Sequence, residues 1–155
     1  MIARVTAIIA CVFWVTPTAA QQPERVDLML VLAINASGST ANGDFETQIV
    51  GHVQALQSTQ GMKTIRAGAL KRSGVSAIVW SDDPQQTRCV PWSVIADKAD
   101  AARVAERLRH RCKILGGTTA IGGAIRNATN QFAWSRLESD RWVIDISANE
   151  PANEG

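Results

Sequence analysis

Asn35, Ser37 and Ser39 alternate along one short segment and carry oxygen atoms that can bind a small divalent cation. They lie in VLAINASGST (residues 31–40), where an apolar stretch changes into a polar one. Mg²⁺ prefers oxygen ligands, but because it gives up its water reluctantly it usually needs one or two carboxylates as well. The amide at position 35 therefore weakens this set of oxygen ligands, because an acid at that position would supply a carboxylate. The same residue types are also typical of a turn that caps a following helix, with or without a metal.

Two later polar segments lie in comparable positions. Residues 117–119 precede a predicted helix, and residues 147–153, which include the acidic Glu150, follow the last apolar stretch. Asp145 precedes that segment within an alternating apolar pattern, so we expect it to be a hydrogen-bonded structural carboxylate. Glu150 is therefore the acid that we expect to be best placed for a cation.

These segments can meet only if strands and helices alternate along the chain, and the hydrophobic pattern predicts that they do. Residues 26–34 (VDLMLVLAI) are almost continuously apolar, as in a parallel strand that is covered on both faces. Strands that alternate with helices predict a layered α/β fold, in which ligands bind at the carboxyl ends of the strands. Residues 63–70 fit neither pattern clearly. The further expected elements are a helix with Phe45, Ile49, Val53 and Leu56 on its buried face, strands at 75–80 and 87–92 that pair as a hairpin, a helix from residue 94 that buries Ala101, Val104, Ala105 and Leu108, a helix that buries Ile121, Ala124, Ile125, Ala128 and Phe132, and a strand at 141–147.

Taken together, the stretches VDLMLVLAINASGST, GGTTAIGGAI and VIDISANEPAN resemble the von Willebrand factor A-type fold, and in particular the exported bacterial proteins known as domain of unknown function 1194. The resemblance runs from Val26 to the C-terminus. It implies a doubly wound, mostly parallel α/β sheet of von Willebrand factor A or Rossmann-like type. It also implies a metal-ion-dependent adhesion site, in which an Asp-x-Ser-x-Ser motif, a Thr and a second Asp bind Mg²⁺ or Mn²⁺ and an acidic group of a protein partner completes the shell. Carried over, Ser37 and Ser39 match the two hydroxyl ligands, and Thr118 matches the threonine.

The two acids of that site are replaced by amides in this chain. Asn35 stands at the position of the first Asp, and Asn149 stands at the position of the second. Each lost charge at such short range is worth about 1 to 4 kcal/mol at a surface-like dielectric. Losing both can therefore cost several powers of ten in affinity. We expect the binding of Mg²⁺ or Mn²⁺ to be weak or absent, with Glu150 as a partial substitute.

The two ends of the chain carry predictions of their own. Residues 1–20 have a basic start at Arg4, a short apolar run and a small-residue cleavage site, as in a secretory signal peptide. We therefore expect export to the periplasm or the exterior, with no stable membrane anchor after cleavage. Residues 21–25 are expected to be a flexible leader and residues 26–155 one domain. Because the fold that the chain resembles continues past its third loop, we expect a C-terminally incomplete copy whose last strand is an unprotected edge.

The net charge bears on the class of partner, and the cysteine content bears on whether a disulfide forms. The chain has a formal net charge of +2, and without Arg4 it keeps 15 basic and 14 acidic residues. This near-neutral balance argues against a nucleic-acid partner, because such proteins need a dense basic face. The basic residues between positions 103 and 113 are expected to offset the dipole at a helix end. Once Cys11 leaves with the signal, Cys89 and Cys112 remain, and the sequence leaves open whether their Cα atoms come close enough to pair.

The sequence shows no arrangement typical of an enzyme. The two histidines are far apart, and neither a GxSxG segment nor a phosphate-binding glycine motif is present. We therefore interpret the chain as a non-enzymatic interaction domain with an impaired metal site, which docks another protein through the loops at its strand ends. A hydrolase has the least support. The alternative is an intact adhesion module that depends on Mg²⁺ or Mn²⁺ and binds its ion through Ser37, Ser39, Thr118 and Glu150.

Overall fold

Strands and helices alternate along the part of the chain that the structure describes. That part is residues 22–38, 40, 42–82 and 86–148 of a computed structural model. In chain order the elements are β1 (Glu24–Arg25), β2 (Leu28–Asn35), α1 (Asn42–Gln57), α2 (Thr59–Ile65), β3 (Ser73–Trp80), β4 (Gln86–Ile95), α3 (Lys98–Arg111), α4 (Ile121–Ala133), β5 (Leu137–Glu138) and β6 (Trp142–Ile146).

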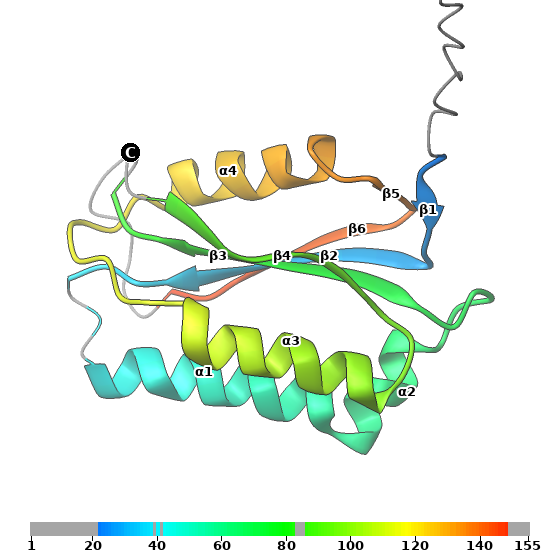
Figure 1. Ribbon diagram of the computed structural model, residues 1–155. Coiled ribbons are helices and arrows are strands. Elements are labelled where there is room, and N and C mark those ends of the chain that lie inside the picture. The colour runs from blue at the N-terminus through cyan, green and yellow to red at the C-terminus, as the bar shows by residue number, and fades with distance from the viewer. Residues whose placement is uncertain (1–21, 39, 41, 83–85, 149–155) are drawn as a thin grey trace, which may run out of the picture.

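The main sheet lies between two layers of helices. Its strand order is β4-β3-β2-β6, with β2 parallel to both β3 and β6 and with β4 antiparallel to β3. α4 covers one face, and α1, α2 and α3 cover the other (Figure 1). This confirms the predicted α/β fold with a mostly parallel sheet. Because the three parallel strands end on the same side, the loops that follow them are brought to one edge of the sheet.

β2 is apolar from Leu28 to Ile34 because both of its faces are covered. Leu32 and Ile34 pack into the core under α1 and α3, whereas Met29, Val31 and Ala33 pack into the core under α4. Side chains alternate between the two faces of a strand, so a strand that is covered on both sides needs apolar residues at successive positions. The sequence pattern of residues 26–34 therefore reports the two helical layers directly.

Several element boundaries differ from the expected ones. Residues 59–65, within and just before the unassigned stretch, form the short helix α2, whose first turn is capped by the Ser58 hydroxyl as it accepts from Gly61 N at 2.8 Å. The hairpin strand β4 runs on to Ile95, and α3 begins only at Lys98 because Asp97 caps it by accepting from Asp100 N. Glu24 and Arg25, expected in a flexible leader, instead pair with β5 as the short strand β1.

β6 lies at one edge of the sheet and pairs with β2 among the described residues. Its Trp142 is 60% exposed, yet its ring stacks on Phe132 of α4 with ring centroids 5.0 Å apart. The Trp142 indole also donates to Ser139 O at 2.9 Å. α4 thus extends its cover of the sheet to the edge strand through this aromatic pair.

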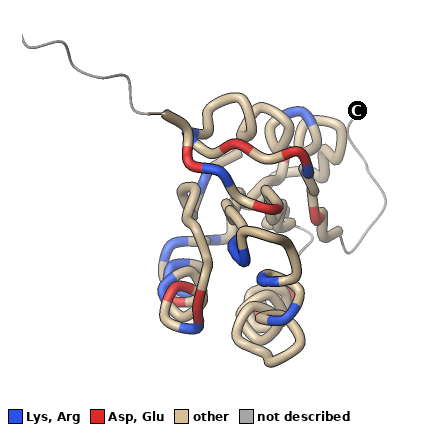
Figure 2. Tube along the Cα trace, turned by 90° about the vertical axis from the view of Figure 1, so that its right-hand side faces the viewer, with Lys and Arg blue, Asp and Glu red and all other residues tan. Residues whose placement is uncertain are grey.

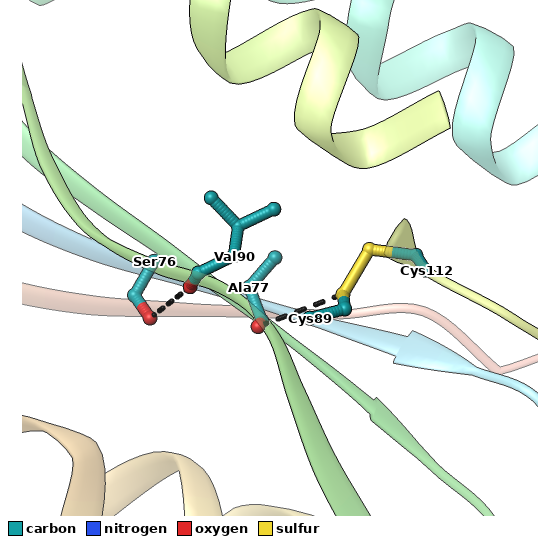
Figure 3. Close-up of a disulfide and its surroundings, with 5 residues drawn as sticks. All are labelled: Ser76, Ala77, Cys89, Val90 and Cys112. Atoms are coloured by element: carbon teal, nitrogen blue, oxygen red, sulfur yellow. Dashed lines mark hydrogen bonds between the residues drawn. A yellow bond between two sulfur atoms is a disulfide. The ribbon is translucent and has the colours of Figure 1, made fainter. Parts of the chain in front are cut away.

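Cys89 and Cys112 form a disulfide that ties β4 to the end of α3 (Figure 3). Their Cα atoms are 4.9 Å apart, and both side chains are buried in the core under α1 and α3. Close to this point the register of the β3–β4 pair shifts, and the Ser76 hydroxyl donates to Val90 O at 2.9 Å (Figure 3). The pairing that the sequence leaves open is therefore present.

Two helical glycines differ sharply in their surroundings and predict opposite effects for the same substitution. A Cβ on Gly61 would lie 1.8 Å from Ala55 O, which is backbone and has little room to move, because α1 and α2 meet here at a sharp turn. We expect Gly61→Ala to lower the free energy of unfolding by about 1 to 3 kcal/mol, as for other overpacked sites. Urea unfolding followed by far-UV circular dichroism measures the change.

Gly51→Ala is the matched control. Gly51 lies in α1, and a Cβ there would meet nothing within 4 Å. Alanine is a better helix former than glycine, so we expect this variant to raise the free energy of unfolding by about 0.8 to 1 kcal/mol. A Gly61→Ala variant that is as stable as the natural protein would contradict the close approach at Gly61.

Candidate functional site

Backbone hydrogen bonds join the loop after β2 to the loop between α3 and α4. Ala36 O accepts from the backbone N–H groups of Leu115 and Gly116, at 2.9 and 3.0 Å. Gly38 N donates to Gly117 O at 2.9 Å. Gly116 and Gly117 have φ angles of +83° and +80°, a region that glycine adopts without strain. The glycine pair therefore lets the second loop turn sharply and lie against the first.

The polar side chains at the end of β2 are buried and bonded to one another. Asn35 Oδ1 accepts from Ser37 N at 3.0 Å, and both residues are buried. Ser37 Oγ lies 3.3 Å from Thr40 Oγ1 and 3.3 Å from Thr119 Oγ1. Three hydroxyls and one amide thus form a compact group that spans the first two loops.

Thr119 makes the hydroxyl contact with Ser37, and the adjacent Thr118 is the residue that the resemblance matches to the metal-binding threonine. Thr119 is buried, whereas Thr118 is exposed. The two threonines are adjacent, and their sequence context does not distinguish them. What separates them is the glycine turn, which places one side chain inward and the next one outward.

The third loop approaches the group through Ser147. The Ser147 hydroxyl donates to Gln48 Oε1 of α1 at 2.6 Å, and Ser147 N donates to Ala33 O at 3.0 Å. Gln48 Nε2 lies 3.4 Å from Asn35 O. The end of β6 is therefore tied both to β2 and to α1. Three other candidate ligands, Ser39, Asn149 and Glu150, lie outside the described residues.

Asp82 is an acid at this edge that the sequence analysis did not select. It follows β3, and a Cβ built on Gly117 would lie 2.8 Å from Asp82 Oδ2. Its Oδ1 is 3.4 Å from Ser81 Oγ. In the sequence, Ser81-Asp82-Asp83-Pro84 is also typical of a turn. The signal that singles out Asp82 is its position directly after a buried strand whose carboxyl end faces the same edge.

Asp145 lies apart from this group. Its Oδ2 is 3.9 Å from His52 Nδ1 of α1, and burial lowers the pKa of His52 while the Asp145 charge opposes that shift. The two residues line a cavity of about 370 Å³ between the sheet and the helices α1 and α2, together with Leu28 and Leu30. Asp145 is thus a partner of His52 on the helical face rather than a member of the hydroxyl group.

The described oxygen atoms of this group carry no formal charge. Asn35, Ser37 and Thr119 are neutral donors, and the Asn35 carboxamide already accepts from Ser37 N. No group of three His, Cys, Asp or Glu side chains is placed to bind a metal within the described ranges. A small dication needs negative charge to lose its water, and this group supplies none.

The comparisons place the chain among domains of one architecture. The family model described as "Protein of unknown function (DUF1194)" matches residues 25–155. No curated protein matches the chain. The von Willebrand factor domain of the type V pili tip protein Mfa5 from Porphyromonas gingivalis superposes with a TM-score of 0.56 at 15% identity, over 82% of this chain and 39% of that one. A structure of three N-terminal domains of Mfa5 gives a TM-score of 0.50 at 16% identity, over 78% of this chain and 19% of that one.

The two structural comparisons show the fold, and they also show a difference in chain length. The chain spans well under half of the Mfa5 chains that it matches. In the described ranges, none of the helices has both the length and the apolar character that crossing a bilayer requires.

Proposed function

The chain belongs to the DUF1194 family and has a von Willebrand factor A-like fold, and from this we propose that it is an exported protein-interaction module with an impaired metal-ion-dependent adhesion site. The partner is another protein, which docks on the loops at the carboxyl ends of β2, β3 and β6. The module is non-enzymatic in this proposal. The likeness to a domain of a pilus tip protein supports an interaction role outside the cytoplasm.

The observation that carries the proposal is the bonding of Asn35. Its Oδ1 accepts from Ser37 N, and the hydroxyl of Ser37 lies 3.3 Å from those of Thr40 and Thr119. These contacts join the two loops through uncharged side chains. With an amide at this position, the loops keep their shape as a docking surface, while the attraction for a dication falls.

A second candidate is an adhesion module that works with Mg²⁺ or Mn²⁺. Its ion would be bound by Ser37, Ser39 and Thr118, which the family resemblance implies, and by Glu150, the acid next to Asn149 in the sequence. The observation that favours it is the carboxylate of Asp82 beside Gly117, which adds negative charge next to the second loop.

Thermal unfolding with added Mg²⁺ or Mn²⁺ separates the two candidates. A cation that binds the folded state must raise the melting temperature by mass action. We expect no rise for the natural protein beyond the rise that Ca²⁺ or an equal ionic strength of NaCl gives. A saturable rise that is specific to Mn²⁺ or Mg²⁺ and disappears with EDTA would overturn the proposal in favour of the second candidate.

A further inference from the structure

A pocket lined by basic residues lies at the end of the molecule opposite the candidate site. It has a volume of about 350 Å³ and lies where α2, the loop before β3 and the first turn of α3 meet. Figure 2 faces this end, and blue Lys and Arg positions occur there on the helical tubes of the lower half and on the loop between them. The lining residues are Thr59, Met62, Lys63, Arg66, Lys71 and Lys98.

The four cations of this pocket are not neutralised within the described part of the chain. None of their side chains forms an ion pair or a hydrogen bond with another described residue. The lining contains no acid. Positively charged side chains that line the same pocket repel each other, and this repulsion favours an anion as a ligand.

The acids that neighbour these residues along the chain have other partners. Asp97 accepts from Asp100 N as the cap of α3, and Asp100 accepts from Ala96 N and pairs with Arg103. Asp27 accepts from Leu70 N and Arg72 N, and these hydrogen bonds lower its pKa. Each of these carboxylates is therefore engaged in stabilising a loop or a helix start.

Lys71 lines the pocket in a backbone conformation that lysine rarely adopts. Its φ is +56°, and it is the one residue other than glycine with a positive φ among the described residues. Such a conformation costs free energy in a residue with a Cβ, and it occurs often where function requires it. A glycine would remove the strain, but it would also remove one of the four positive charges.

We propose that this pocket binds a phosphate group, either of a soluble phosphate ester or of a phospholipid headgroup. A phosphate dianion neutralises several neighbouring positive charges in a small volume, whereas a single carboxylate would leave most of them without a counter-charge. Arg66 offers a planar set of donors that matches phosphate oxygens, and the Thr59 hydroxyl can donate as well. Leu70, next to Lys71, is 43% exposed, which adds an apolar contact for a lipid.

The first test titrates the ¹⁵N-labelled chain with inorganic phosphate at constant ionic strength, and follows its amide signals by NMR. We expect saturable shifts centred on residues 59–71 and on Lys98. In Lys63→Gln/Lys98→Gln the affinity should fall about tenfold or more, the change expected on losing a charge-assisted hydrogen bond. The matched control is Arg111→Gln/Arg141→Gln, which removes the same charge from exposed positions outside this pocket and should leave the affinity within about twofold.

Lys71→Gly is a second variant that tests the same pocket without threatening the fold. Because glycine adopts a positive φ freely, the variant should be at least as stable as the natural protein, and phosphate should still bind about tenfold more weakly. If Lys63→Gln/Lys98→Gln loses stability, the phosphate affinity of Lys71→Gly still tests the proposal.

The second test distinguishes the two sources of the phosphate. Sedimentation with phosphatidylcholine vesicles is compared with and without phosphatidic acid. Phosphate binding without vesicle binding supports a soluble ester, and binding to phosphatidic acid that is lost in Lys71→Gly supports a headgroup. The proposal is overturned if neither probe binds, or if binding is equal in the pocket variants and the control. Since the pocket lies away from the loops at the strand ends, this result is independent of the adhesion-site proposal.

Discussion

Asn35→Asp combined with Asn149→Asp is expected to give the protein an affinity for Mn²⁺ about a hundredfold or more above that of the natural sequence. Each restored charge is worth about 1 to 4 kcal/mol at short range, and each 1.4 kcal/mol is a factor of ten. An Asp at position 35 keeps the oxygen that accepts from Ser37 N, so the loop geometry is preserved.

The same change should lower stability in the absence of metal. Position 35 is buried, and a buried carboxylate without a cation is unfavourable. The variant should therefore melt at a lower temperature than the natural protein in EDTA, and Mn²⁺ should recover the loss. Isothermal titration calorimetry gives the affinity, and thermal unfolding gives the recovery.

Two controls define this result. Asn35→Asp alone isolates the described position, because Asn149 lies outside the described residues. Asn130→Asp adds a charge at an exposed position of α4 and should leave the cation response unchanged. If the double variant binds Mn²⁺ no better than the natural protein, the electrostatic explanation of the impaired site is wrong.

Removing the disulfide is expected to lower the free energy of unfolding by about 3 kcal/mol. The bond closes a loop whose ends are 23 residues apart, and in the chain-entropy model a loop of this size gives that value. For a domain of this size, the melting temperature of Cys89→Ala/Cys112→Ala should fall by about 6 to 12 °C. Urea unfolding followed by tryptophan fluorescence measures the free energy.

Reduction provides the internal control for this prediction. Dithiothreitol should destabilise the natural protein by a similar amount and should leave the double variant unchanged, since that variant has no disulfide to reduce. A loss below about 1 kcal/mol would show that the cross-link restrains the unfolded chain far less than the loop length implies.

Much of the fold could be predicted because its strands and helices have clear periods. The unbroken apolar run of β2 indicates two covered faces, and the spacing of Phe45, Ile49 and Val53 indicates the buried face of α1. β1 was missed because Glu24 and Arg25 have no strand pattern of their own. They become a strand through pairing with Leu137 and Glu138, far along the chain.

The candidate site could be located from the sequence but not assembled from it. Parallel strands bring their carboxyl ends together, so the meeting of the first two loops follows from the fold. Which threonine faces Ser37 depends on the positive φ angles of Gly116 and Gly117, and the sequence does not give those angles. Asp82 was missed because a turn-forming segment explains its presence without any contact to another loop.

The parallel pairing of β2 with β6 also bears on how fast the chain can fold. Ala33 and Ser147 are hydrogen-bonded although they lie 114 positions apart in the sequence. The second edge of the central strand β2 is therefore paired only when one of the last described segments reaches it. Long-range pairing of this kind raises the mean sequence separation of contacts and slows folding. A chain that folds slowly remains unfolded for longer, which favours its passage through a membrane pore during the proposed export.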